Sequence, residues 1–207
     1  MRSGVWDKLN QRLRIPPGFQ GKGLASLINR SREIEFAKQS ICAGRGIFNT
    51  GPCGTGKTHL ATGILLDTIT DAVKRWISNG RATLQPLGLF LSTQEFLEQI
   101  RGDFGNGRNS ARSEYLAKYT SIDLLLIDDL AAGVFHDWQR EILGLLIDRR
   151  CRQNKQTLIT SNFDLDMIAS IIDDRTASRI AEMCSVIRFD GQDFRVNPQP
   201  AEISDSN

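Results

Sequence analysis

This chain of 207 residues lacks several features that would assign it to a familiar class of protein. Its four cysteines form no C-x-x-C pair, which argues against a zinc site or a disulfide framework and fits a reducing cytosol. It has no apolar run of the length that a membrane helix needs, and no signal-peptide core at its N-terminus. No internal repeat is visible. We therefore expect a soluble, cytoplasmic protein.

The chain also has little excess charge, with a formal net charge of +2. The overall charge does not indicate nucleic-acid binding, so any contact with nucleic acid must come from local basic patches. The length suffices for one good hydrophobic core and falls short of two full domains. We predict a basic N-terminal segment and linker at 1–25, one folded domain at 26–195 and a disordered polar tail at 196–207.

The apolar pattern alternates between strands and helices. It predicts strands near 46–50, 87–92, 122–130, 156–162 and 185–189. It predicts helices at 26–41, from the end of the glycine-rich loop to about 76, at 136–153, and as a pair over 164–182. A further helix is predicted to begin at residue 93, with Thr93 as its N-cap. Loops are predicted at 79–88 and 102–111. This order indicates an α/β fold with a parallel sheet and helices on both faces. Ligands of such sheets bind beyond the carboxyl ends of the strands.

The stretch GPCGTGKT at 51–58 follows the first strand and fits the pattern G-x-x-x-x-G-K-[ST]. Glycines let backbone N–H groups converge on an anion, and the helix that follows directs its positive dipole end to the same place. A glycine-rich turn that matches by chance is the alternative, but the flanking strand and helix patterns argue against it. We predict an ATP site in which Lys57 reaches the β- and γ-phosphates and Thr58 binds Mg²⁺. Its contacts are Gly51, Pro52, Cys53, Gly54, Thr55, Gly56, Lys57, Thr58 and His59.

Polar side chains follow two other strands. Asp128 ends the run LLLI, where a carboxylate can hold Mg²⁺, and Asp129 can orient and activate a water. A pair of solvated loop acids is the alternative. Asp129 is shorter than the glutamate that many such ATPases carry, so hydrolysis is expected to be slow. Asn162, after the run TLITS, can help to place the attacking water, or else forms an ordinary Asx-turn.

The segments GPCGTGKTHLA, LLLIDDL, RRCRQNKQTLITSNFD and DDRTASRIAEMCSVIRFDGQDFR, in this order, resemble the AAA+ ATPases of the DnaC/IstB branch. These are bacterial and phage helicase loaders and ATPase helpers of transposition. The resemblance covers about residues 15–195. It implies a P-loop NTPase of the AAA+ type with a five-stranded parallel sheet and no separate helical lid.

The resemblance also implies roles for single residues. Asn162 matches the sensor asparagine. Arg179, or as second choice Arg175, matches the arginine that reaches the nucleotide of a neighbouring subunit in a ring or spiral. Alternatively, both are surface arginines that pair with Asp173, Asp174 or Glu182. Arg195 matches a further nucleotide-sensing arginine, or is a solvated terminal residue.

A patch for single-stranded DNA is predicted between the second and third strands, where basic and aromatic side chains can track a backbone and stack bases. Its residues are Arg101, Arg108, Arg112, Tyr115, Lys118 and Tyr119. A solvated amphipathic helix and loop explains them equally well. A second basic run at 149–155 is better explained as cations favoured at a helix C-terminus.

The function that we predict is an ATPase that assembles on single-stranded DNA and loads a replicative helicase. An ATPase helper of a transposase is the nearest alternative, and the short N-terminal segment leaves the partner protein open. Two other classes remain: a small-molecule P-loop kinase, and a nucleotide-gated scaffold that binds ATP and hardly turns it over.

Overall fold

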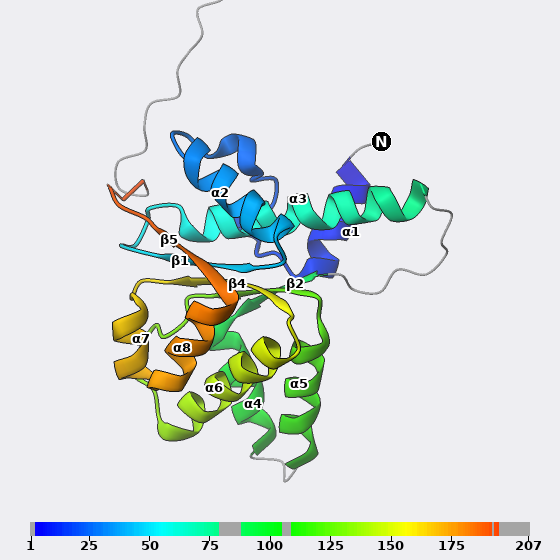
Figure 1. Ribbon diagram of the computed structural model, residues 1–207. Coiled ribbons are helices and arrows are strands. Elements are labelled where there is room, and N and C mark those ends of the chain that lie inside the picture. The colour runs from blue at the N-terminus through cyan, green and yellow to red at the C-terminus, as the bar shows by residue number, and fades with distance from the viewer. Residues whose placement is uncertain (1–2, 79–87, 105–108, 192, 195–207) are drawn as a thin grey trace, which may run out of the picture.

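The computed structural model describes residues 3–78, 88–104, 109–191 and 193–194 (Figure 1). In chain order the elements are α1 (Ser3–Leu13), η1 (Pro17–Phe19), η2 (Leu24–Ser26), α2 (Ser31–Cys42), β1 (Gly46–Thr50), α3 (Lys57–Ser78), β2 (Gly88–Ser92), α4 (Thr93–Phe104), α5 (Asn109–Ser121), β3 (Leu124–Asp128), α6 (Asp137–Arg152), β4 (Gln156–Ser161), α7 (Leu165–Ile171), α8 (Asp174–Met183) and β5 (Cys184–Arg188). No helix within these ranges is long and apolar enough to cross a membrane.

The five strands form one sheet in the order β2-β3-β4-β1-β5, and every neighbouring pair is parallel. β4 lies between β1 and β3, with Thr50 of β1 in register with Ser161 of β4. The carboxyl ends of these three strands therefore meet at one edge of the sheet. That edge receives the glycine-rich loop from β1, the two acids from β3 and Asn162 from β4.

Helices cover both faces of the sheet, which confirms the predicted fold class. Figure 1 shows α1, α2 and α3 on one face and α4 to α8 on the other. The run LLLI in β3 serves both faces, because alternate side chains of a strand point in opposite directions. Leu124 and Leu126 pack in the cluster under α3, and Leu125 and Ile127 pack in the cluster under α6.

The segment before residue 26 packs against the sheet. α1 contacts β2, and Leu13 at its end and Ile15 just after it are buried in the same cluster as Leu60 and Phe90. Further along, η2 lies against α3, where a Cβ on Gly63 would come within 2.6 Å of the Leu24 side chain. Glycine at this position therefore permits the close approach of the N-terminal segment to α3.

Several element boundaries differ from those predicted. The helix expected at 26–41 begins only at Ser31, and helix extends into the predicted loop at 102–111 from both sides. Thr93 is not the cap of α4, because its hydroxyl donates to the Asp128 carbonyl oxygen at 2.8 Å. Ser92 takes that role, with its hydroxyl oxygen 3.5 Å from the Glu95 N–H. The connector at 79–87 and the tail at 196–207 lie outside the described residues.

Candidate functional site

The loop between β1 and α3 has a backbone that needs its glycines. Gly51, Gly54 and Gly56 have φ angles of 139°, 73° and 98°, a region that disfavours other residues. A Cβ on Gly51 would also collide with the Phe189 carbonyl oxygen, and one on Gly54 with the Asp193 carboxylate. The segment after β5 thus lies directly against the loop, and the Phe194 N–H donates to the Gly54 carbonyl at 3.2 Å.

Lys57 is folded back onto this loop. Its Nζ donates to the carbonyl oxygens of Gly51 at 2.8 Å and Pro52 at 2.6 Å, and the residue is only 5% exposed. The first turn of α3 is anchored by Asn49 of β1, whose side-chain amide donates to the Lys57 carbonyl at 3.1 Å. Asn49 was missed from the sequence. The signal was present, because Asn is a polar residue at the end of an otherwise buried strand.

Asp128 ends β3 in a network of hydroxyl groups. One of its carboxylate oxygens accepts a hydrogen bond of 2.6 Å from Thr160 of β4. Burial raises the pKa of Asp128, and hydrogen bonds from Thr160 and Thr58 oppose that rise. A nearby cation would favour the ionised carboxylate. Asp128 and the Thr58 hydroxyl therefore converge in front of the loop as a pair of oxygen ligands of the kind that Mg²⁺ uses.

Asp129 is exposed and has a φ of 56°, which is uncommon for a residue other than glycine. Its backbone N–H donates to the Thr160 hydroxyl at 3.0 Å. The same hydroxyl donates to Asp128, so Thr160 holds both acids in place. Sequence reasoning missed Thr160, because a threonine is common in a β-strand.

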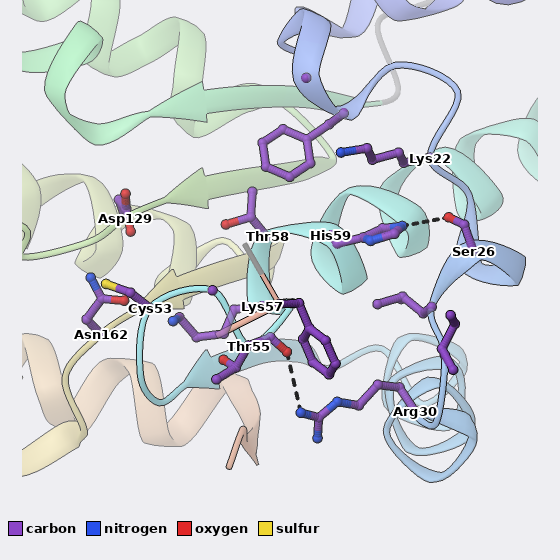
Figure 2. A pocket seen from close by; sticks show the side chains of 17 residues that line it. Lys22, Ser26, Arg30, Cys53, Thr55, Lys57, Thr58, His59, Asp129 and Asn162 are labelled. Carbon is purple, nitrogen blue, oxygen red and sulfur yellow. Dashed lines mark hydrogen bonds between the residues drawn. The ribbon is translucent and has the colours of Figure 1, made fainter. Parts of the chain in front are cut away.

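A cavity of about 420 Å³ lies over the loop (Figure 2). From the loop and α3 it is lined by residues 53–59, and Asp129 and Asn162 border it on the sheet side. The other walls come from the N-terminal segment and the end of the chain, with Gly18, Phe19, Lys22, Ser26, Leu27, Ile28, Arg30 and Phe194. The structure thus gathers most of the predicted nucleotide and water-orienting residues around one cavity.

The N-terminal wall of this cavity is held by polar contacts that the sequence did not reveal. Arg30 lies 4.9 Å from the centre of the Phe189 ring and donates to the Asp190 carbonyl at 2.8 Å. His59 and Ser26 share a hydrogen bond of 2.8 Å (Figure 2). Burial lowers the pKa of His59, which favours the neutral ring at neutral pH.

The two arginines of α8 are not among the residues that line the cavity. Arg175 and Arg179 both donate to Asp148 of α6, and Arg179 also donates to Glu182 at 2.6 Å. Of the alternative partners that the sequence offered, Asp173, Asp174 and Glu182, only Glu182 is found, paired with Arg179, and Asp148 was not foreseen. Arg195 and Arg108 lie outside the described residues.

The predicted DNA patch is divided in the structure. Arg101 of α4 is exposed, and Arg112 of α5 pairs with Glu141 of α6 at 2.8 Å. Lys118 lies over the Tyr119 ring at 5.3 Å. Tyr119 itself is fully buried and packs edge-on against Phe96, so its suggested role in base stacking is wrong.

The second basic run is largely occupied with contacts inside the chain. Arg150 is fully buried and donates to the carbonyl oxygens of Tyr119, Ile122 and Gln156 at 2.6 to 2.8 Å. Burial lowers its pKa to about 9, which leaves the guanidinium charged at neutral pH. Arg150 therefore neutralises carbonyl groups at the end of α5, and it is unavailable to nucleic acid.

A parallel sheet of this order, with a glycine-rich loop after β1 and an acid pair after β3, defines a P-loop NTPase of the AAA+ type. The family described as IstB-like ATP binding protein matches residues 31–199, and the chain belongs to that family. The resemblance to the DnaC/IstB branch is thereby confirmed.

Three relatives illustrate the similarity. The replicative helicase loader DnaC of Buchnera aphidicola subsp. Baizongia pistaciae is 24% identical over 63% of this chain and 48% of that protein, so the chain spans about half of its length. The insertion sequence IS232 putative ATP-binding protein of Bacillus thuringiensis subsp. berliner is 25% identical over 86% of the chain and 67% of that protein. The crystal structure of the DnaC helicase loader has a similar fold, with a TM-score of 0.67 and 22% identity over 84% of this chain and all of that one.

Proposed function

We propose that this chain binds Mg²⁺ and ATP, hydrolyses ATP slowly, assembles on single-stranded DNA and acts in loading a replicative helicase. The observation that carries the ATPase proposal is the meeting of three strand ends at one cavity. Lys57 begins the helix after the β1 loop, and Asp129 and Asn162 directly follow β3 and β4, so all three reach the cavity from the same edge of the sheet. The likeness to DnaC relatives supports the helicase-loading role.

Each residue at this edge has a distinct task. Lys57 exchanges its two carbonyl partners in the loop for phosphate oxygens, which form stronger, charge-assisted hydrogen bonds. Thr58 and Asp128 hold Mg²⁺, which neutralises phosphate charge when it is bound. Among the described residues no group of three or more His, Cys, Asp or Glu side chains could hold a metal. The other ligands of the ion must therefore be phosphate and water oxygens, as is common for Mg²⁺.

Asp129 and Asn162 border the cavity from two adjacent strands and together orient the attacking water. Asp129 accepts the proton of that water. Its side chain is one methylene shorter than glutamate, and this shorter reach is the reason that we propose slow turnover. Phosphate release from ATP without any added acceptor separates this function from a kinase. ATP binding without phosphate release, even with DNA, would instead select a nucleotide-gated scaffold.

We assign Arg179 the role of stabilising the transferring phosphate in a neighbouring subunit's site, with Arg175 as the second choice. Support comes from its place on α8, away from the cavity of its own subunit. An arginine supplied by a neighbour raises hydrolysis by about three to five orders of magnitude in related enzymes. Arg179→Ala should bind ATP normally and hydrolyse it poorly. Mixing it with Lys57→Ala should restore part of the activity, because each variant keeps what the other lacks.

Sedimentation tests the assembly directly. ATP should shift the protein from small species to a ring or open spiral, and single-stranded DNA should favour the larger form. Monomers alone in the presence of ATP and DNA, with no rescue in the mixture, would contradict both the assembly and the role of Arg179.

Single-stranded DNA is proposed to contact Arg101, Arg112 and Lys118 on α4 and α5, with Arg108 as a further member of the predicted patch. Arg101 also lines a polar hollow beside Val134 and Trp138, at the start of α6. Arg101→Ala should weaken oligonucleotide binding and reduce its salt dependence, because one phosphate contact fewer releases fewer counterions. Lys74→Ala, which changes an exposed lysine of α3, is the control and should bind DNA normally.

A transposase is the second candidate partner, favoured by the family match and by the likeness to the IS232 protein. Pull-down of the chain with a replicative helicase and with a transposase, each with and without ATP, distinguishes the two. ATP-dependent capture of the transposase alone would replace the helicase-loading proposal and leave the ATPase proposal intact.

A further inference from the structure

One carboxylate on α6 binds three arginines. Asp148 accepts from Arg175 at 2.9 Å and Arg179 at 3.2 Å through one oxygen, and its other oxygen contacts Arg152 at 3.0 Å. The side chain of Asp148 is 12% exposed, whereas Arg175 is 63% exposed. A nearly buried carboxylate thus lies under a patch of guanidinium groups that faces outward, on the side of the sheet that carries α8 (Figure 1).

The contacts fix Arg179 more completely than Arg175. Nε of Arg179 donates to Asp148, and Nη1 donates to Glu182 one turn further along α8. Within the described part of the chain, Nη2 of Arg179 donates no hydrogen bond. Two nitrogens of the guanidinium are therefore held in place, and the third keeps its capacity to donate to a ligand.

Charge in this cluster stays positive, because Arg152, Arg175 and Arg179 outnumber Asp148 and Glu182. The acids therefore orient the arginines without cancelling the attraction for an anion. Fixing an arginine beforehand also lowers the conformational entropy that binding would otherwise cost. A planar guanidinium held at one edge is well suited to meet phosphate with the other.

We propose that Asp148 is a positioning residue for ATP hydrolysis, which holds Arg179 in the orientation that reaches the γ-phosphate in the neighbouring subunit's site. This inference rests on the proposed role of Arg179 and assigns it a partner on a different helix. Through Arg179, Asp148 thus affects hydrolysis in the site of the neighbouring subunit and does not affect the site of its own subunit.

The test uses Asp148→Ala and Asp148→Asn in the full chain, with Asp123→Ala as the matched control. Asp123 also forms an ion pair with a basic residue, Lys155, at 2.6 Å, but it lies just before β3, at the end away from the cavity. Both Asp148 variants should bind ATP with unchanged affinity and assemble with ATP. Their turnover should fall roughly tenfold to a hundredfold, the range expected when a catalytic group is misplaced by about 1 Å. Asp123→Ala should hydrolyse ATP at the parent rate.

Mixtures of variants separate positioning from a structural effect. Asp148→Ala mixed with Lys57→Ala should regain activity, since one subunit offers an intact site and the other an intact Arg179. Asp148→Ala mixed with Arg179→Ala should stay inactive, because both defects lie in the donating subunit. The opposite pattern, rescue by Arg179→Ala and none by Lys57→Ala, would place Asp148 in its own subunit's site and overturn the proposal.

Failure of this inference differs from failure of the proposed function. If Arg179→Ala is inactive and both Asp148 variants turn over ATP at the parent rate, the positioning role is wrong and the trans-acting arginine stands. If Arg179→Ala itself is fully active, the trans-acting arginine is wrong, and Asp148 loses its role with it. Asp148→Asn keeps the shape of the side chain, so it provides the same test should Asp148→Ala fail to fold.

Discussion

Thr160→Val should show what one hydroxyl group contributes both to stability and to the chemistry of the two acids at the end of β3. The substitution keeps the shape of a fully buried side chain. It removes the hydrogen bond to the Asp128 carboxylate and leaves the Asp129 N–H without its partner. A hydrogen bond to a charged group contributes about 1.5–3 kcal/mol and an unsatisfied buried donor costs about 1–3 kcal/mol. The free energy of unfolding should therefore fall by about 2.5–6 kcal/mol.

The same substitution should change the chemistry of the site. The hydrogen bond from Thr160 lowers the pKa of Asp128, so its loss raises that pKa further above the ordinary value. Only the ionised carboxylate holds Mg²⁺. The acid limb of the pH profile for Mg²⁺-dependent ATP hydrolysis should thus move to higher pH, and more Mg²⁺ should be needed for half-maximal activity.

Thr157→Val is the matched control for this experiment. Thr157 lies near the start of the same strand, is also fully buried, and accepts a hydrogen bond from Arg150 at 2.9 Å. Thermal or urea unfolding should show comparable destabilisation of both variants, and Mg²⁺ titrations of hydrolysis at several pH values should show a change in Thr160→Val alone. Identical Mg²⁺ and pH dependence in the two variants would refute the reasoning.

Three further predictions test other parts of the structure. Lys57→Ala should weaken ATP binding by at least tenfold in a nucleotide titration; the variant should stay folded, with a lower unfolding midpoint because two hydrogen bonds to the loop are lost. Lys74→Ala on the exposed face of the same helix should bind ATP normally, and equal affinity of the two variants would contradict the loop assignment. Asp129→Asn should still bind Mg²⁺ and ATP but should no longer hydrolyse ATP. Asp128→Asn should need more Mg²⁺ for hydrolysis. If both variants hydrolyse ATP at the parent rate, this strand end is not the active site. Arg150→Met should lower the free energy of unfolding by about 3–5 kcal/mol, because it leaves buried carbonyl groups without hydrogen-bond donors. A loss below about 1 kcal/mol in urea unfolding would refute that account.

The sequence by itself determined the class of the fold and the main parts of the cavity. Strand, glycine-rich loop and helix are local features, and their periodicity and turn chemistry are visible in a single stretch of chain. The rule that ligands lie at the carboxyl ends of parallel strands then directed attention to Asp128, Asp129 and Asn162. All three lie at one edge of the observed sheet.

Tertiary structure alone decided which polar side chains support that edge. Asn49 is unusual in a strand and Thr160 is ordinary there, but the sequence shows the partner of neither, and both matter because of the atoms that they contact in the fold. Likewise, the contacts of Arg30 with the segment after β5 join positions far apart in the chain.

The charged and aromatic residues were the least predictable from sequence. Tyr119 and Arg150 have side chains that suit either a surface or an interior, and only packing placed both in the core. The sequence placed Arg175 and Arg179 on one face of a helix by their spacing, but Asp148 comes from a helix more than twenty residues earlier. Local pattern reveals which face a side chain occupies, whereas its partner across the fold depends on how the helices pack against one another.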